Sequence, residues 1–260
     1  MATPNTPARV LAAALAADPA TPFLTFYDDA TGERVELSLA TLDNWVAKTA
    51  NLLQDGLGTD PGERVAIMLP PHWQGAVWML AAWSAGLTVT LDDGAGGDPD
   101  ILVTGPDRLA EVTAGPGAGA RDTVALALRP LGGPFTEPLP AGVLDYGAEV
   151  PGYADQFTAY VPVDPHAPAL VTPGATLTGE ELLAAATRRA EEIGLEPSGR
   201  LLTDANPADP YGCLEALLAP LAQQGSVILV RNPDLGQVDR RCEVEKVTVT
   251  RLRAAGTPGA

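Results

Sequence analysis

The first hundred residues alternate short apolar runs with amphipathic segments, in the order that α/β proteins show. Residues 38–53 repeat apolar positions with a period close to 3.6, which predicts a helix capped by Ser38. A largely apolar strand is expected at 64–69, then a helix over 72–85 that is apolar on nearly every face, and a second strand at 87–91. Short connections between strand, helix and strand predict a βαβ unit with parallel strands.

Further elements are expected on both sides of this unit. A helix capped by Thr6 should end near Asp18, and a hairpin with a glycine-containing turn should follow over 23–37. Residues 149–168 form a polar connector interrupted by prolines. The remaining pattern predicts strands at 101–104, 123–128, 169–172, 201–202, 226–230 and 244–252, and helices at 179–193 and 211–223.

These elements predict an α/β fold with a mixed, mostly parallel sheet arrangement flanked by helices. We expect one α/β domain over 1–253, which could divide into subdomains at 1–160 and 161–253. The small and polar residues of 254–260 predict a frayed tail.

Composition excludes several classes of partner. The formal net charge of −17 would repel nucleic acid and anionic membrane surfaces, so neither is an expected partner. The longest apolar run, 76–87, is too short to span a bilayer, and the first residues lack the basic region of a signal peptide, which together indicate a cytoplasmic protein.

Metal and nucleophile chemistry finds little support in the sequence. The two cysteines, Cys213 and Cys242, make neither a disulfide framework nor a zinc site, and we expect both to be buried. His72 and His166 have no Cys, Asp or Glu at metal-ligand spacing, so surface or capping roles are expected for them. The four tryptophans lie on predicted helices and are expected in the core. No metal site and no catalytic residue are predicted.

Segments 38–53, 61–71 and 81–92 carry a specific pattern. In order and spacing they are similar to a helix written "YxELxxxxNRLAxxL", then "GDRVAxxLPN", then "AxxxAGAxxxPLxP". These segments open the AMP-forming acyl-CoA synthetases and related adenylate-forming enzymes. Residues 164–174, 177–183, 217–230 and 245–248 resemble later parts of the same family. The resemblance implies a trimmed N-terminal portion of such an enzyme, covering about half of its catalytic domain.

The family's nucleotide loop, "TSGTTGxPKG", is the part that this chain matches least. Here Thr172, Pro173 and Gly174 lead directly into Ala175–Thr178, and the Lys of the motif has no counterpart. Small residues and a Lys hold ATP phosphates in such loops. No Lys or Arg occurs between residues 164 and 187. We expect a phosphate here to meet Asp164, Glu180 and Glu181 instead, each at a cost of roughly 4 kcal/mol at about 4 Å.

If nucleotide binding persists, the resemblance assigns it to a vestigial loop of Thr172, Gly174, Thr176 and Thr178. The family's "PxxHxxG" histidine is missing from 207–212, the later "YGxTE" and "TGD" motifs have no counterpart, and Lys246 does not match the catalytic Lys.

These departures predict a non-catalytic relative of acyl-CoA synthetases that uses no cofactor. It would bind a protein partner, a second copy of itself as a homodimer, or a small ligand. Two alternatives stay open: a degenerate but active adenylate-forming or nucleotide-binding protein completed by a partner chain, and an unrelated α/β enzyme on the same scaffold.

Overall fold

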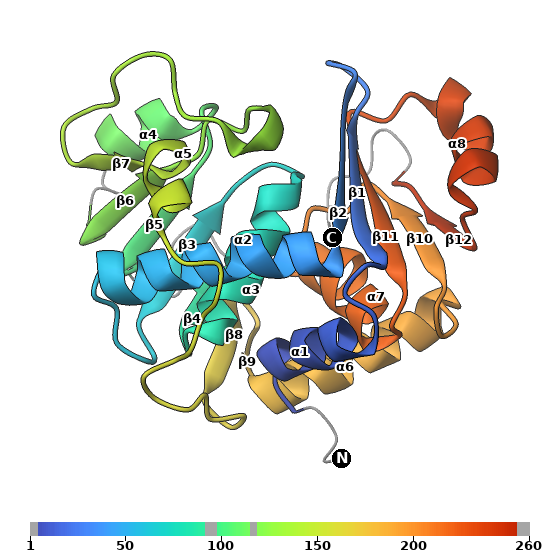
Figure 1. The fold of residues 1–260 in the computed structure, drawn as a ribbon, viewed down its shortest axis with the longest axis horizontal. Helices are drawn as coiled ribbons and strands as arrows, with labels where there is room; N and C mark the ends of the chain where they lie inside the picture. The colour runs from blue at the N-terminus through green and yellow to red at the C-terminus, as the bar shows by residue number, and fades with distance from the viewer. Residues whose placement is uncertain (1–4, 92–97, 115–118, 254–260) are drawn as a thin grey trace.

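The structure, a computed structural model, describes residues 5–91, 98–114 and 119–253. Two sheets form its frame (Figure 1). One sheet contains β1 (Pro22–Asp28), β2 (Glu33–Ser38), β10 (Arg200–Thr203), β11 (Ser226–Arg231) and β12 (Val249–Arg251), in the order β12-β10-β11-β1-β2. All of its pairs are parallel except the hairpin pair β1–β2.

The second sheet has seven strands. They are β3 (Arg64–Met68), β4 (Thr88–Thr90), β5 (Ile101–Thr104), β6 (Asp122–Ala125), β7 (Val143–Asp145), β8 (Pro168–Thr172) and β9 (Ala175–Thr178), in the order β7-β6-β5-β3-β4-β8-β9. Every pair is parallel except β8–β9. The mixed, mostly parallel α/β architecture predicted from the sequence is therefore confirmed. Each sheet takes strands from both sides of residue 160, so the sheets do not follow the subdomain boundary considered above; the domain boundaries stay a prediction.

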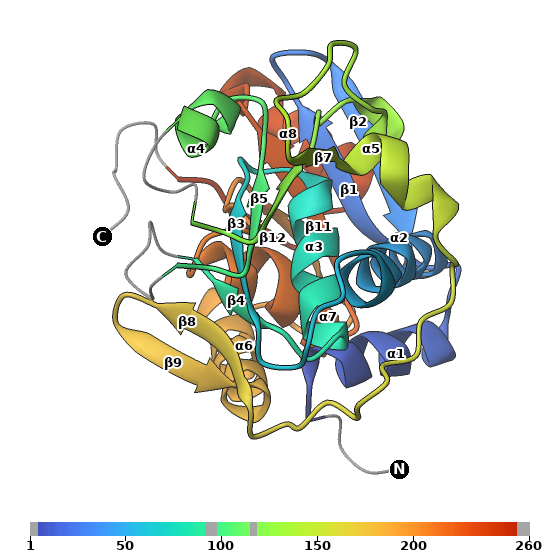
Figure 2. The same cartoon turned by 90° about the vertical axis from the view of Figure 1, so that its left-hand side faces the viewer.

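The helices fill the space between the sheets and cover their outer faces (Figures 1 and 2). They are α1 (Pro7–Ala17), α2 (Leu39–Asn51), α3 (Trp73–Ser84), α4 (Leu109–Ala114), α5 (Tyr146–Glu149), α6 (Gly179–Ile193), α7 (Ala219–Ala222) and α8 (Val238–Glu245). Two π-helical turns, η1 (Leu52–Gly56) and η4 (Cys213–Leu218), extend α2 and precede α7, and 3₁₀ turns occur at η2 (Pro130–Gly132), η3 (Val150–Gly152) and η5 (Leu235–Gln237). Within the described residues, no helix is long and apolar enough to cross a membrane.

Helix α3 is the centre of the core. It contacts α1 and α2, strand β1 of one sheet, strands β3 and β4 of the other, and η4. Every residue from Trp73 to Trp83 is buried, and Trp73 and Trp78 are fully enclosed. A helix packed on all sides needs no polar face, which explains why its sequence shows no amphipathic period. The predicted burial of this helix and the predicted parallel βαβ unit of β3, α3 and β4 are confirmed.

The sequence prediction was wrong at the C-terminal strand. It expected a strand over 244–252, but α8 continues through Glu245 and only Val249–Arg251 are extended. Helix α8 ends at Lys246, whose φ of 54° is left-handed. Cys242, Val247 and Leu252 pack on the outer face of the five-stranded sheet. The apolar spacing that suggested one strand therefore arises from three consecutive elements, namely the end of a helix, a turn and a short strand. Short elements α4, β7 and α5 were not predicted.

His72 was expected at the surface or in a cap. It caps α3, since its Nδ1 accepts the backbone N–H of Gln74 at 3.2 Å, but only 1% of the residue is exposed, so the surface alternative is wrong. The ring stands edge-on to Phe26, with 4.7 Å between centroids. Burial, together with the nearby Arg231 charge, lowers the His72 pKa to about 3. The imidazole is therefore neutral and carries its proton on Nε2.

The connector between β7 and β8, called the strap here (residues 150–167), is held by one polar face of α2 and η1. Three side chains donate to its carbonyl groups: Lys48 to Pro151 and Tyr153, Asn51 to Ala154 and Gln156, and Gln54 to Thr158. The spacing of three residues places all three donors on one side of the helix. The hydroxyl of Tyr160 adds a bond to Asp55 at 2.7 Å. These bonds hold the strap in place, although apart from the short turn η3 it has no regular secondary structure.

The central position of α3 generates a first prediction. Replacing Trp78→Asp puts a charge at a fully buried position of the core and should abolish cooperative unfolding or cost at least about 3–5 kcal/mol in the free energy of unfolding. Urea denaturation followed by circular dichroism measures it. Val244→Asp, at a side chain that is 68% exposed, is the control and should change stability by less than about 0.5 kcal/mol. A Trp78→Asp protein with a wild-type midpoint would contradict the placement of α3.

A second prediction concerns pH. In the unfolded chain, His72 is protonated below about pH 6.5, whereas in the folded chain it stays neutral down to about pH 3. The free energy of unfolding therefore falls as the pH drops from about 6.5 to about 3. Each pH unit below 6.5 should remove about 1.4 kcal/mol, or roughly 2 kcal/mol by pH 5. His72→Asn keeps a capping oxygen and should lose about 2 kcal/mol less than wild type between pH 7.5 and pH 5, by urea denaturation. The same substitution at exposed His166 is the control. If wild type and His72→Asn lose the same unfolding free energy between pH 7.5 and pH 5, protonation of His72 does not cause the loss of stability.

The strap gives a third prediction. Asn51→Ala removes the donor of two hydrogen bonds to the strap and should cost about 1–2 kcal/mol in unfolding free energy. It should also speed limited proteolysis within residues 150–167, which mass spectrometry of the first cleavage product locates. Asn44→Ala makes the same change at an exposed position of α2. If both variants are cleaved at the wild-type rate, Asn51 does not hold the strap.

Candidate functional site

A hollow of about 510 Å³ opens at the carboxyl ends of β3 and β4. Its walls come from both sheets, because residues that follow β3, β4, β5 and β10 all line it, as does the turn between β8 and β9. Ligands of open α/β sheets bind outside the carboxyl ends of parallel strands, where neighbouring loops diverge. This hollow, called the cleft below, is therefore the candidate site.

The loop after β10 closes one side of the cleft. Asn206 donates from Nδ2 to the carbonyl of Leu69 at 2.8 Å, and its Oδ1 accepts the backbone N–H of Ala208 at 3.0 Å. The first bond ties the loop of one sheet to the end of β3 in the other. Gly212 ends this loop where a Cβ would lie 1.9 Å from the Asn206 carbonyl oxygen, so only glycine permits the approach. The segment that lacks the family's histidine is thus a rigid wall of the cleft.

Charged side chains at the cleft are mostly paired with neighbours. Asp107 lies 3.5 Å from Arg231, and Asp209 lies 3.5 Å from Arg253. Arg108 forms an ion pair with Glu111 at 3.0 Å. The sequence prediction did not find Asp107, Arg108 or Asp209. Asp107 and Arg108 follow the carboxyl end of β5, so the rule on strand ends could have found them once β5 was predicted.

The predicted nucleotide loop is a β-hairpin. Strands β8 and β9 pair antiparallel from Pro168↔Thr178 to Thr172↔Ala175, leaving Pro173 and Gly174 as the turn. Figure 2 shows the hairpin at the edge of the seven-stranded sheet, with α6 beside it. The Thr172 hydroxyl donates to the Ala175 carbonyl at 3.3 Å, which closes the turn on itself. The chain therefore joins β8 to β9 through a two-residue turn at the position where the resemblance aligns the ten-residue motif "TSGTTGxPKG".

The four predicted cofactor-binding residues do not converge. Thr172 and Gly174 lie at the turn, and Pro173 between them borders the cleft. Thr178 lies at the base, about 13 Å away at roughly 3.3 Å per strand residue. Thr176, between them, is exposed. The role of these residues in nucleotide binding stays a prediction.

The backbone N–H groups at the start of α6 already donate hydrogen bonds within the protein. Thr178 and Glu181 form a capping box: the Glu181 N–H donates to the Thr178 hydroxyl at 3.2 Å, and the Thr178 N–H donates to the Glu181 carboxylate at 2.9 Å. That bond lowers the pKa of the Glu181 carboxyl. The N–H of Glu180 donates to the Pro165 carbonyl at 3.1 Å. A helix N-terminus can bind phosphate through such groups, but here a carboxylate and a carbonyl already occupy them.

The structure also corrects the expected acidic surroundings of this loop. Glu180 and Glu181 begin α6 at the base of the hairpin, and Asp164 lies in the strap segment that packs there, far from the turn. Among the described residues, the acidic side chains that line the same hollow as the turn residue Pro173 are Asp107 and Asp209. The described part of the hairpin carries no Lys or Arg at either end. The hairpin therefore offers a triphosphate no cationic side chain of its own.

Metal ligands do not cluster in the part of the chain that the structure describes: no group of three or more His, Cys, Asp or Glu side chains there could hold a metal ion. Cys213 is fully buried, and burial raises its thiol pKa, so it is unreactive at neutral pH. Cys242 is only partly buried.

Comparisons with known proteins agree with the fold and the motifs. The AMP-binding enzyme family matches residues 11–98. An acyl-CoA synthetase from Brucella canis has a similar solved structure, with a TM-score of 0.77 over 95% of this chain and 17% identity, a likeness that shows the fold alone. This chain spans 47% of that synthetase. The resemblance inferred from the sequence motifs is confirmed.

A nearer relative spans almost the same length. The TIGR03089 family protein of Mycobacterium tuberculosis (strain ATCC 25618 / H37Rv) is 42% identical over 251 residues, which cover 95% of this chain and 99% of the relative. The fold, the AMP-binding enzyme match and this identity together show that the chain belongs to the TIGR03089 family and is related to the acyl-CoA synthetases.

Proposed function

We propose that this protein is a non-catalytic relative of acyl-CoA synthetases that works by binding a partner protein or a small ligand. The observation that carries the proposal is the β8–β9 hairpin, which leaves only Pro173 and Gly174 as a turn where the sequence resemblance aligns the nucleotide loop. Adenylate formation requires the β- and γ-phosphates of ATP to be held while the carboxylate attacks the α-phosphate. A paired hairpin offers neither converging N–H groups nor a cation for that task.

The electrostatics of the cleft support the same conclusion. Charge stabilisation in phosphoryl and nucleotidyl transfer comes from cations and preorganised donors. Two carboxylates, Asp107 and Asp209, line the same hollow as the turn residue Pro173, and Arg108 in that lining pairs with Glu111. Donors at the start of α6 are taken by Thr178, Glu181 and Pro165. What remains is a preformed hollow that joins two sheets, which suits binding better than catalysis.

The runner-up, an adenylate-forming protein completed by a partner chain, uses the same cleft but requires that chain to supply the phosphate-binding groups. It differs from the proposal in one measurable property, because only a completed site would turn over ATP.

The test is carboxylate-dependent exchange of pyrophosphate into ATP, measured over a broad panel of acids. We expect an exchange rate no higher than that of the heat-denatured protein. ATP at about 1 mM should shift the melting temperature by less than about 1 °C. The same assay on protein purified from its native host, with any associated chains, separates the runner-up from the proposal.

Exchange by the isolated chain would overturn the proposal, provided that it arises in the cleft. Asn206→Ala, which removes the bond between the two sheets, should then reduce the exchange, whereas Asn44→Ala on α2 should not.

A further inference from the structure

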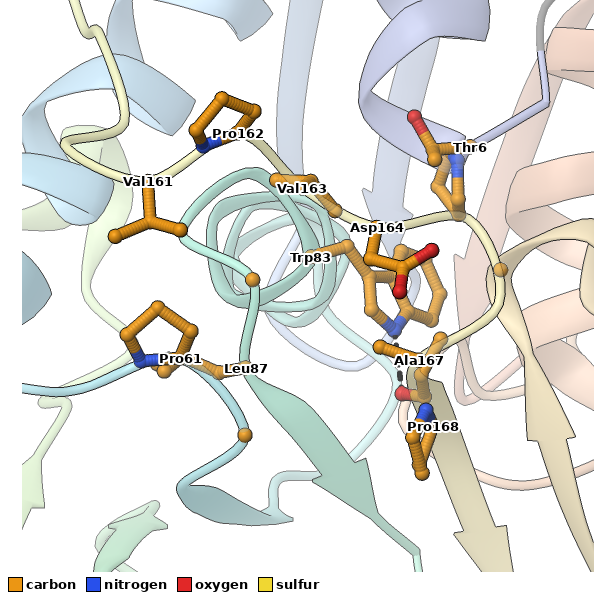
Figure 3. Close-up of a pocket in the computed structure, with 15 residues that line it drawn as sticks. Thr6, Pro61, Trp83, Leu87, Val161, Pro162, Val163, Asp164, Ala167 and Pro168 are labelled. Carbon is orange, nitrogen blue, oxygen red and sulfur yellow. Dashed lines mark hydrogen bonds between the residues drawn. The ribbon is translucent and has the colours of Figure 1, made fainter.

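A second hollow, distinct from the cleft, lies over the C-terminal end of α3 (Figure 3). It measures about 200 Å³ and is enclosed by chain segments far apart in sequence. Pro61 and Leu87 border it on one side, and Val161 and Val163 of the strap on another, with the Trp83 indole beside them. Its walls are predominantly apolar. An apolar cavity of about 150 Å³ is enough to accept a benzene ring, so this hollow has the size for one phenyl-like group.

The walls of this hollow are held by hydrogen bonds. The Trp83 indole N–H donates to the Ala169 carbonyl at 2.8 Å, which fixes the ring against β8. The Gly62 N–H donates to the Gly86 carbonyl at 2.9 Å, which fixes the floor. Gly86 has a φ of +76°, and a Cβ there would lie 3.7 Å from Pro61 and 3.8 Å from Val163. Only glycine adopts this conformation readily, and it leaves the space between these two walls open.

The charge that lines this hollow is negative. Asp164 is the charged residue in its lining, and among its described lining residues none is Lys or Arg. The Asp164 carboxylate accepts a hydrogen bond from the backbone N–H of His166, which donates to Oδ1 at 2.9 Å. Figure 3 shows the Asp164 side chain projecting from the strap, over the Trp83 indole in this view, and Asp164 is an exposed residue. The last turn of α3, a helix of 12 residues, adds the negative end of its dipole at the same place.

We propose that this hollow binds a small organic cation: an ammonium group facing Asp164 on an apolar body of about phenyl size. Apolar walls would take the body, and the carboxylate with the α3 terminus would select a positive charge over a neutral or negative one. Nothing in this inference depends on the cleft or on the absence of catalysis. It adds a second ligand site at the opposite end of the strands β3 and β4.

Isothermal titration calorimetry of the full chain with phenethylammonium tests the proposal. Its neutral isostere 2-phenylethanol and the anion 3-phenylpropionate are the ligand controls. We expect the cation to bind about threefold to tenfold more tightly than the alcohol, and the anion not to bind. The difference in affinity between cation and alcohol should shrink as the salt concentration is raised. Asp164→Asn keeps the acceptor for His166 and should erase the preference for the cation while keeping the alcohol's affinity.

Two further variants make the outcome decisive. Glu137→Gln removes one negative charge from an exposed loop outside the hollow and should leave all affinities unchanged, so a general effect of net charge is separated from a local one. Val163→Trp should fill the hollow and abolish binding of cation and alcohol alike, in a protein whose cooperative melting is checked first. The proposal is overturned if phenethylammonium does not bind, if the alcohol binds equally well, or if Asp164→Asn and Glu137→Gln behave alike.

Discussion

Burial of α3 between the two sheets is the constraint on which the rest of the structure depends. Side chains from Trp73 to Trp83 face β1 on one side, β3 and β4 on the other, and α1 and α2 around the remainder. Removing such a helix from water on all sides stabilises the fold through a large buried apolar area. It also fixes the separation and relative orientation of the sheets, because neither can move without exposing part of that area.

The two hollows lie at opposite ends of this helix. The N-terminal end follows β3, whose carboxyl end borders the cleft, and Asn206 crosses from the other sheet to bond with Leu69 there. The C-terminal end, at Gly86, forms the floor of the apolar hollow under the strap. The positions of both hollows therefore follow from the packing of α3 between the two sheets. Their chemistry differs: the cleft mixes paired charges with apolar walls, whereas the second hollow has one carboxylate among apolar side chains.

How far the sequence predicts this structure depends on the range of the interactions involved. The α2 period, the caps at Thr6 and Ser38, and the uniformly apolar α3 are local signals, and each predicted its element correctly. The hairpin of β8 and β9 was not predicted, because motif comparison directed attention to a missing loop and not to the Thr-rich, strand-forming residues 175–178 that remained. Buried His72 and the helix α8 depend on packing against distant strands, which no local pattern contains. The cleft likewise combines segments more than a hundred residues apart.

The central claim is that the chain keeps the fold of adenylate-forming enzymes while a paired hairpin stands in place of their nucleotide loop. Amide hydrogen exchange over residues 168–178, with and without ATP and magnesium, tests it most directly. Backbone pairing predicts that amides of β8 and β9 are protected in the free protein and that ATP leaves their exchange unchanged. Rapid exchange in the free protein that slows when ATP is added would contradict the account, because it would show an open loop ordered by nucleotide.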